Sequence, residues 1–343
     1  MYRKILGKTT SHQELSETEV FELIGAINKG EVSDVQIAGF QVALLMKGAS
    51  LKETAYIAKA MRANCVPLRP KTREELMDTC GTGGGLSTFN ISTATALVAA
   101  AAGIPVAKHG SRSIASLSGS ADVLEALGIN IHLQPAEAEK MIEEIGIAFL
   151  YAPLFHPVMG KVLPPEQDLG IKTIFYSIIG PLINPALAPR HLLGVYRPDL
   201  LDTVTYVAKE LGYTSAMFVH GQDGLDEISL LGKTRINHLK DGRITTMEIA
   251  PEDFGLRRCS LSDIRTSTPE VNAETIREVF SGKITGPRRE AILLNAAGAL
   301  VVGARAVDFR AGISLAAELI DSGAAAKKLG ELKEMSNSFG KAS

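Results

Sequence analysis

The residues that most clearly could bind a ligand or take part in a reaction lie between Asp78 and Leu127, where glycines, hydroxyl groups and a lysine follow one another closely. Three consecutive glycines, Gly83 to Gly85, come directly after Gly81 and Thr82. Such a run exposes backbone N–H groups and tolerates positive φ, so it can wrap around a phosphate group. The stretch therefore predicts a loop that binds a polyanion.

The elements around this loop bring further polar groups to the same place. An Ala-rich run, Ala94 to Ala102, predicts a helix with Ser92 as its N-cap. Ile104 to Ala107 predicts a buried strand that is followed by Lys108, and Ser120 is expected to cap the next helix. Ligands of open α/β sheets bind at the carboxyl ends of strands, and helix N-termini attract anions. A phosphate or pyrophosphate site is expected at this edge.

Composition limits the classes of protein that the chain can belong to. It has 343 residues, of which 45% are hydrophobic and 22% charged, so about two domains with ample core are expected. A net charge of −2 gives no general electrostatic attraction to nucleic acid or to an anionic membrane. Three scattered cysteines lack metal-ligand spacing and suit a reducing compartment. Without a recognisable signal peptide or membrane span, a cytoplasmic location is expected.

The first 70 residues or so are expected to be helical. Three capping boxes precede apolar positions at helical spacing, namely Ser16 with Glu19, Ser33 with Gln36, and Ser50 with Glu53. Pro67 and Pro70 then predict a linker. The simplest role for a helical bundle without candidate catalytic residues is packing or dimerisation.

From Glu74 onward, strand and helix patterns alternate, which predicts a parallel sheet. Ile147–Tyr151 and Ala216–His220 are expected strands, and Glu290–Val302 is an expected buried helix. Thr234–Lys240 and Arg243–Ile249, joined by Asp-Gly, predict a β-hairpin. The fold class is therefore α/β: a small all-helical N-terminal domain and a larger domain with a central, mainly parallel sheet flanked by helices.

The motif region closely resembles the anthranilate phosphoribosyltransferase family. Four ordered blocks carry the resemblance: GTGG at 81–84, TFNIST at 88–93, KHG at 108–110 and SGSADVLEALG at 118–128. The resemblance implies a nucleoside phosphorylase/phosphoribosyltransferase-like fold. It implies a helical dimerisation domain, residues 1–70 plus about 163–189, and an α/β domain, residues 71–162 and 190–343. The implied assembly is a homodimer.

The resemblance also implies a Mg²⁺-dependent transfer of the phosphoribosyl group from phosphoribosyl pyrophosphate (PRPP) to an aromatic amine, with anthranilate as the default acceptor and without a covalent enzyme intermediate. The implied donor-binding residues are Gly81, Thr82, Gly83, Gly84, Thr88, Asn90, Ser92, Thr93, Lys108 and Ser120. Ser92, Asp226 and Glu227 would bind Mg²⁺, with two ions per site expected. The implied pathway is tryptophan biosynthesis.

The implied acceptor-binding positions are His109, Ser111, His156, Glu166 and Tyr176. Three of them differ from the family pattern, because Ser111 and Tyr176 replace Asn and Glu166 replaces an Arg that meets the acceptor carboxylate. The glycine loop is also one residue shorter than G-T-G-G-D-G-x-x-T-F-N and lacks its Asp. Unless Glu166 points to solvent, or Arg112 or Lys172 supplies a substitute cation, a neutral or cationic aromatic amine is the expected acceptor.

Two other functions share parts of this pattern. A pyrimidine nucleoside phosphorylase has the same architecture and would use phosphate, but its lysine block does not read K-H-G-x-R. A non-catalytic nucleic-acid-binding relative would need a basic cleft and a decayed metal site. The near-neutral charge and the intact Asp226-Glu227 pair argue against that alternative.

Overall fold

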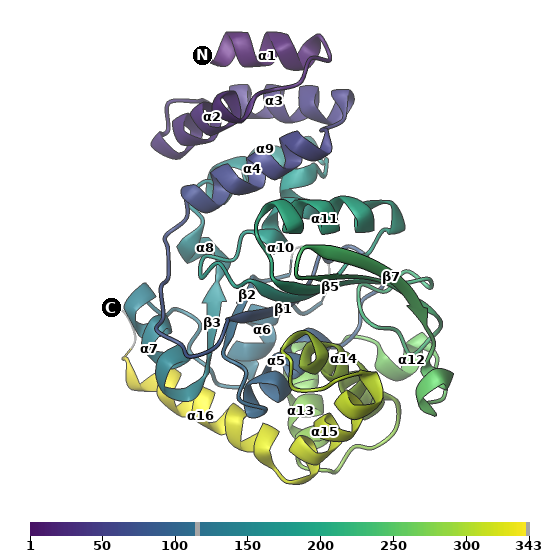
Figure 1. Cartoon of the computed structure of the whole chain (residues 1–343). Helices are drawn as coiled ribbons and strands as arrows, with labels where there is room; N and C mark the ends of the chain where they lie inside the picture. The colour runs from purple at the N-terminus through teal and green to yellow at the C-terminus, as the bar shows by residue number, and fades with distance from the viewer. Residues whose placement is uncertain (114–116, 341–343) are drawn as a thin grey trace.

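The computed structural model describes residues 1–113 and 117–340, and a stack of helices forms its amino-terminal end (Figure 1). The first four helices are α1 (Tyr2–Thr10), α2 (Glu17–Lys29), α3 (Asp34–Lys47) and α4 (Leu51–Ala63). All three predicted capping boxes are present, at the starts of α2, α3 and α4. In each box the serine side chain accepts a hydrogen bond from a backbone N–H of the first turn, which fixes where the helix begins.

A later segment of the chain packs against these helices. Helix α9 (Met159–Leu169) contacts α3, and Gln41 Nε2 on α3 donates to Val162 O at 2.8 Å. The π-helical turn η1 (Phe175–Ile179) and α10 (Gly180–Leu182) follow. Their buried side chains belong to the same apolar cluster as those of α2, α3 and α4. This segment therefore connects the helical stack to the sheet.

A seven-stranded sheet lies beneath the helical stack (Figure 1). Its strands are β1 (Met77–Gly81), β2 (Val106–Gly110), β3 (Ile147–Tyr151), β4 (Arg190–Gly194), β5 (Ser215–Gly221), β6 (Thr234–Lys240) and β7 (Arg243–Ile249). The spatial order is β3-β2-β1-β4-β5-β6-β7, with parallel pairs up to β5 and antiparallel pairs beyond it. Asp241 (φ 50°) and Gly242 (φ 75°) form the predicted two-residue turn, because both adopt positive φ. The mainly parallel sheet and the hairpin are confirmed.

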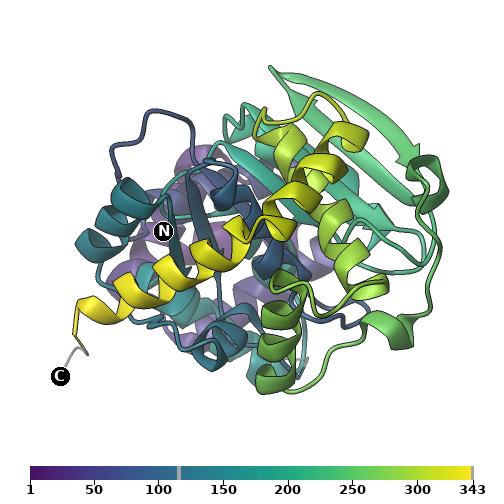
Figure 2. The same ribbon diagram turned by 90° about the horizontal axis from the view of Figure 1, so that it is seen from below.

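Helices cover both faces of the sheet. The remaining ones are α5 (Ile91–Ala101), α6 (Ser120–Ala126), α7 (Pro135–Ile145), α8 (Ala152–Phe155), α11 (Pro198–Glu210), η2 (Pro251–Phe254), α12 (Leu261–Ile264), α13 (Pro269–Phe280), α14 (Pro287–Val302), α15 (Phe309–Asp321) and α16 (Ala324–Ser338). Helix α11 packs between β5 and α4, whereas α5 and the buried α14 lie on the opposite face (Figure 1). Figure 2 shows α16 running across that face, where it contacts α5 and α7.

Three local predictions around the glycine run are wrong in detail. Helix α5 begins at Ile91 after Asn90, so Ser92 is its second residue and not its N-cap. Helix α6 begins at Ser120 itself, after Gly119, whose N–H donates to Asp122 Oδ2 at 2.8 Å. The expected strand at 104–107 starts at Val106, since Pro105 has no N–H to donate to a ladder. The shift places Lys108 inside β2 and not after it.

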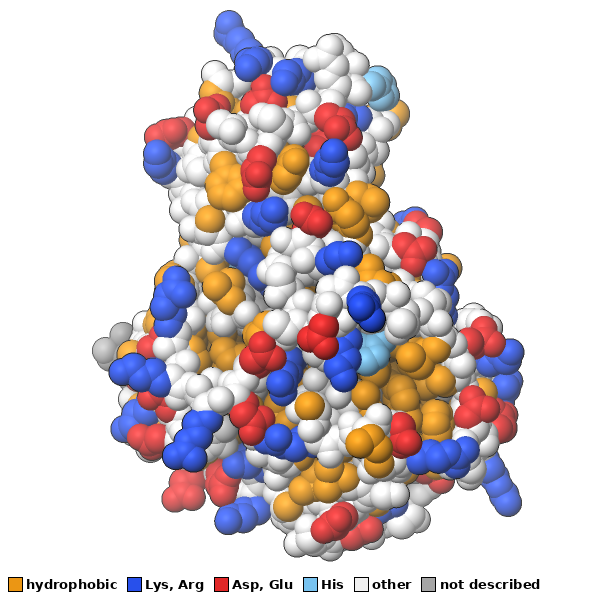
Figure 3. Space-filling model, viewed as in Figure 1, with side chains coloured by type: hydrophobic (Ala, Val, Ile, Leu, Met, Phe, Trp, Pro, Cys, Tyr) orange, Lys and Arg blue, Asp and Glu red, His pale blue; other side chains and the backbone are white. Residues whose placement is uncertain are grey.

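Helix α16 continues to Ser338, and Ser336 Oγ accepts a hydrogen bond from Asn130 N at 3.1 Å. Among the described residues, no helix has the length and apolar character needed to cross a membrane. Charges of both signs are interspersed over the face shown in Figure 3, without a continuous basic surface there.

Candidate active site

The glycine run follows β1 and folds against the loop that carries the two predicted metal-binding acids. Gly83 (φ 65°) and Gly84 (φ 93°) adopt a left-handed conformation that residues with side chains rarely adopt. Gly83 N donates to Asp226 Oδ2 at 2.8 Å. A Cβ at Gly81 or at Gly194 would overlap atoms of Asp226. Glycine at these two strand ends therefore permits the close approach of the acidic loop.

Asp226 and Glu227 are adjacent, partly buried carboxylates in the loop after β5. Burial raises the pKa of Asp226, although the Gly83 N–H opposes this shift. Burial and then the charge of Asp226 raise the pKa of Glu227 well above its usual range, and Lys108 opposes them. A divalent cation would relieve this repulsion, and carboxylate oxygens are ligands that Mg²⁺ prefers. The two acids thus fit the expected metal.

Lys108 lies in β2, next to β1, with only 3% of its surface exposed. Its Nζ donates to Thr79 O on β1 at 2.6 Å, and burial lowers its pKa while the Asp78 and Glu227 carboxylates oppose the shift. The lysine therefore holds the strand that starts the glycine loop and is near enough to Glu227 for their charges to interact. Its contact with pyrophosphate stays a prediction.

Two donor-side residues support neighbouring backbone. Thr82 Oγ1 accepts from Tyr196 N at 3.1 Å, which holds the glycine run beside the end of β4. Thr88 forms an isolated antiparallel bridge with Arg265. Both interactions fix the course of the loop into α5.

The other predicted donor residues lie at the N-termini of α5 and α6. Asn90 is the N-cap residue of α5, but its Oδ1 accepts from Ser118 Oγ and from Asn272 Nδ2, both at 3.1 Å, so its side chain makes no capping hydrogen bond. Ser120 Oγ donates to Ser111 O at 3.4 Å. Ser92 approaches Glu227 through its backbone N–H, which tends to lower the pKa of that acid. Thr93 is 1% exposed, and its Oγ1 has no hydrogen-bond partner within the described residues.

On the predicted acceptor side, two buried histidines contact each other. His109 and His156 approach through their Nε2 atoms at 3.0 Å, so one ring must donate to the other. Burial lowers the pKa of His156 to about 4 and that of His109 well below its usual range. Both rings are therefore neutral at pH 7. His156 Nδ1 is buried without a partner in the described part of the chain.

The three acceptor positions that depart from the family pattern lie in different surroundings. Ser111 is exposed after β2. Tyr176 approaches the glycine run, since a Cβ on Gly83 would lie 3.9 Å from its hydroxyl oxygen. Glu166 is 3% exposed and is hydrogen-bonded by Thr173 Oγ1, so the alternative in which it points to solvent is wrong, while its role at the acceptor stays a prediction.

Glu166 is directed toward the helical stack. Gln41 Nε2 on α3 lies 3.4 Å from Glu166 Oε1, the same oxygen that Thr173 contacts. Burial raises the pKa of Glu166, although the Thr173 hydroxyl opposes the shift. Among the described residues, this carboxyl shares no hydrogen bond with the histidine pair or with the glycine run.

Sequence reasoning missed a buried polar group that supports the site. Asp78 on β1 is fully buried; its Oδ1 accepts from His109 N at 3.1 Å and its Oδ2 from Asn184 Nδ2 at 2.7 Å. Asp78, Cys80 and His191 could also be taken for a metal cluster, because their ligand atoms lie within 4.8 Å of one another. The Asp78 carboxylate already holds β2 and the loop of Asn184, which favours a structural role. The signal available in the sequence was Asp78 itself, an acidic residue within a strand that is expected to be buried.

Comparison with known proteins places this geometry in a family. Residues 73–326 match the family model described as "Glycosyl transferase family, a/b domain", and residues 3–65 match the model described as "Glycosyl transferase family, helical bundle domain". The chain is 45% identical to an anthranilate phosphoribosyltransferase of Acetivibrio thermocellus, covering 99% of this chain and 98% of that protein. The enzyme of the same name from Methanobrevibacter smithii is also 45% identical, over 98% of this chain and 100% of that protein.

This chain belongs to the anthranilate phosphoribosyltransferase family. It is thus an enzyme of the pentosyltransferase class. The crystal structure of anthranilate phosphoribosyltransferase from Thermus thermophilus is similar with a TM-score of 0.90 and 38% identity, covering 97% of this chain and 99% of that one. The Saccharomyces cerevisiae enzyme in complex with PRPP and Mg gives a TM-score of 0.90 at 29% identity, with 98% of each chain covered.

Proposed function

We propose that this enzyme moves the 5-phosphoribosyl group from PRPP to the amino nitrogen of an aromatic acceptor, with release of pyrophosphate. The contact between Gly83 N and Asp226 Oδ2 at 2.8 Å carries the proposal, because it joins the phosphate-wrapping loop to the acid pair. Gly81 to Gly84 would face the donor with backbone N–H groups, while Asn90, Ser92, Thr93 and Lys108 would hold its pyrophosphate.

Mg²⁺ would be held by Asp226, Glu227 and Ser92, and when bound it would neutralise charge on the pyrophosphate that leaves. Hard oxygen donors and the raised pKa of both acids support this assignment. Two ions per site are part of the proposal.

The chain's own residues favour direct displacement. The Cys80 thiol beside the glycine run stays protonated, because burial and then the Asp78 charge raise its pKa well above its usual range. It therefore offers no thiolate nucleophile. The neutral His109–His156 pair would present uncharged side chains to the acceptor. The lone pair of an aromatic amine would then be free to attack. The protein would act by aligning the two substrates and stabilising the leaving group.

Anthranilate is the default acceptor in this proposal, as it is in the names of the relatives. A neutral or cationic aromatic amine remains the alternative, since Glu166 adds no cation. The position of Glu166 supports the default, because its Oε1 is engaged by Thr173 and faces Gln41. A carboxyl held in this way does not oppose an acidic acceptor as a free carboxylate in the cleft would.

Calorimetry with PRPP, with and without Mg²⁺, tests the donor site. The wild type should bind PRPP more tightly when Mg²⁺ is present, and a Lys108→Ala, Asp226→Ala double variant should lose most of this affinity. The matched control is Lys140→Ala, Glu144→Ala, which removes an exposed ion pair on α7 and should bind as the wild type does. Equal affinity in the wild type and the Lys108, Asp226 variant would refute the site.

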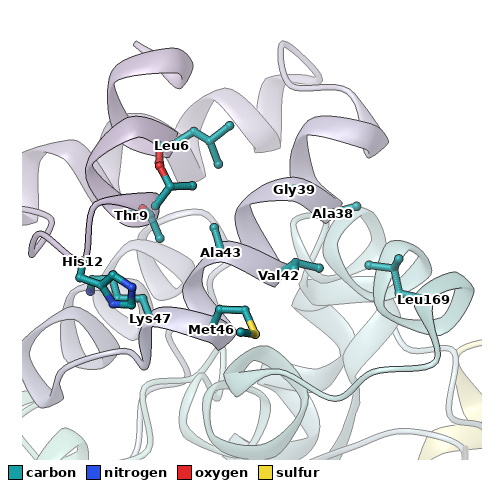
Figure 4. A pocket seen from close by; sticks show the side chains of 11 residues that line it. Leu6, Thr9, His12, Ala38, Gly39, Val42, Ala43, Met46, Lys47 and Leu169 are labelled. Carbon is teal, nitrogen blue, oxygen red and sulfur yellow. The ribbon is translucent and has the colours of Figure 1, made fainter.

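We also propose that residues 1–70 with about 163–189 form a dimerisation domain, and that 71–162 with 190–343 form the donor-binding domain. A groove of about 620 Å³ lies on the helical stack (Figure 4). Its apolar residues include Val42, which is 39% exposed, Met46, which is 76% exposed, and Leu169, which is 46% exposed. An exposed apolar groove of this kind favours a two-fold interface between copies of the chain.

Light scattering at micromolar concentration should give a dimer mass for the wild type. Met46→Glu places a charge in the groove and should shift the mass toward the monomer. Val35→Glu is the control, because Val35 is exposed on the same helix but does not line the groove. A monomer mass for the wild type across the concentration range would contradict the proposal.

A further inference from the structure

An acidic acceptor needs a cation within the site, and position 166 does not supply one. Three basic side chains, Lys108, Arg112 and Lys172, lie close to the groups described above. Their partners in the structure decide which of them is available. This inference rests on the proposed transfer of a phosphoribosyl group to an aromatic amine.

Arg112 is already neutralised by acids of α6. Its Nη1 lies 3.0 Å from Asp122 Oδ1 and 2.5 Å from Glu125 Oε2. Asp122 also accepts from the N–H groups of Ser113 and Gly119, so the arginine is part of a network that holds the start of α6. Moving Arg112 to a substrate would leave two carboxylates without their cation.

Lys108 is not available either. Its Nζ is buried and donates to Thr79 O at 2.6 Å, beside the acid pair on the donor side. Lys108 therefore holds β1, and in the proposed function it would bind the pyrophosphate of the donor. In the proposed function the acceptor would lie on the side of the histidine pair and Tyr176.

Lys172 differs from both. It is exposed on the segment between α9 and η1, and no carboxylate in residues 1–113 and 117–340 lies within ion-pair distance of it. Its Nζ lies 5.0 Å from the centroid of the Tyr176 ring, and a Cβ on Gly84 would lie 3.7 Å from that Nζ. The ammonium group is thus over the glycine run and beside an acceptor-side aromatic ring.

Tyr176 gives this lysine a defined position. A cation over an aromatic face is attracted by the ring, and the Tyr176 hydroxyl oxygen in turn lies near Gly83. Lysine and tyrosine therefore form one unit at the edge of the loop. The substitution of Tyr for the family's Asn at position 176 creates the ring on which Lys172 rests.

We propose that Lys172, positioned by Tyr176, binds the acidic group of an aromatic amine acceptor in place of the Arg that Glu166 replaces. The acceptor class is then an aromatic amine that carries a carboxylate. Lys172 determines specificity, and Tyr176 is a positioning residue. The lysine contributes to acceptor affinity and not to donor binding.

Steady-state kinetics at saturating PRPP and Mg²⁺ test the proposal with two acceptors, anthranilate and its uncharged amide, anthranilamide. Lys172→Met should raise the KM for anthranilate at least about tenfold, the scale expected for loss of a hydrogen bond to a charged group. The kcat should change by less than about threefold, and the KM for anthranilamide by less than about twofold, because the charge of the acceptor is absent there. Lys172→Arg should retain the low KM.

Three further variants complete the design. Tyr176→Leu should raise the KM for anthranilate less than Lys172→Met does, while Tyr176→Phe should keep it, since the ring supports the lysine. Lys52→Met removes an exposed lysine of α4, which lies outside the site, and should behave as the wild type does. Calorimetry should give the same PRPP affinity for Lys172→Met and for the wild type.

Each contrary result has a distinct meaning. An equal rise in KM for both acceptors, or a matching loss of PRPP affinity, would overturn the assignment of Lys172 to the acceptor carboxylate. If the wild type turns over the two acceptors and Lys172→Met does not discriminate between them, only this assignment fails. If the wild type binds PRPP but turns over neither acceptor, the proposed function fails and this inference fails with it.

Discussion

The proposed donor and acceptor sides of the site are built in different ways. On the donor side, backbone groups and an acid pair meet at close range, as in the contact of Gly83 N with Asp226. On the acceptor side, the family positions 111, 166 and 176 carry different side chains, and one of them, Glu166, is turned toward Gln41. Backbone geometry tolerates little change, whereas side chains around an acceptor can be exchanged. The reaction class is therefore easier to infer here than the acceptor.

The largest effect is expected from breaking the backbone approach on the donor side. Gly194→Ala adds a Cβ that would overlap the backbone of Asp226 and displace the acidic loop. A misplacement of about 1 Å can cost roughly a hundredfold in rate, so kcat/KM should fall by that factor or more. Gly25→Ala is the control, because a Cβ there meets open space on α2 and should slightly stabilise the helix. Unchanged kinetics in Gly194→Ala would show that the approach is not needed.

Acid should destabilise the acceptor side. The pKa of His156 is about 4 in the folded protein, below the usual 6.5, because burial disfavours the imidazolium. The unfolded chain therefore binds more protons between pH 6.5 and 4, and the stability present at pH 7 is lost as the pH falls through this window. A shift of this size corresponds to about 3 kcal/mol in the free energy of unfolding.

Urea unfolding at pH 7 and at pH 4.5 measures this effect. The wild type should lose stability between the two conditions, and His156→Gln should lose less. His132→Gln removes a half-exposed histidine, and this variant should lose as much stability between the two pH values as the wild type does. A wild-type stability that does not change across the window would contradict the buried neutral pair.

The smallest effect is expected at Glu166. If its carboxyl is held away from the acceptor, Glu166→Gln should change the KM for anthranilate by less than about twofold. A large decrease of that KM would instead indicate that a negative charge at position 166 repels the acceptor, and would favour a neutral or cationic amine. The variant retains a side-chain oxygen for the Thr173 hydroxyl, so its thermal unfolding should stay close to that of the wild type.

Local patterns predicted much of this fold, and long-range contacts explain what they missed. Asp241 and Gly242 specify the hairpin, and serine three residues before Glu or Gln specifies the starts of α2, α3 and α4. The glycine run and the acid pair were recognisable as motifs. The Asn184–Asp78 hydrogen bond, by contrast, joins residues 106 positions apart. The burial of Glu166 depends on Gln41, which lies on a different helix 125 positions away, and no local pattern encodes it.

The central claim is that the donor side follows the family pattern while the acceptor side differs from it. The stoichiometry of turnover in the wild-type enzyme tests this claim most directly. Purified enzyme is incubated with PRPP, with and without Mg²⁺ and with anthranilate or anthranilamide, while pyrophosphate and the N-(5-phosphoribosyl) product are both quantified. We predict pyrophosphate release only when Mg²⁺ and an aromatic amine are both present, one pyrophosphate per product formed, and more efficient turnover of anthranilate than of its amide. Binding of PRPP without pyrophosphate release in the presence of either amine would contradict the account.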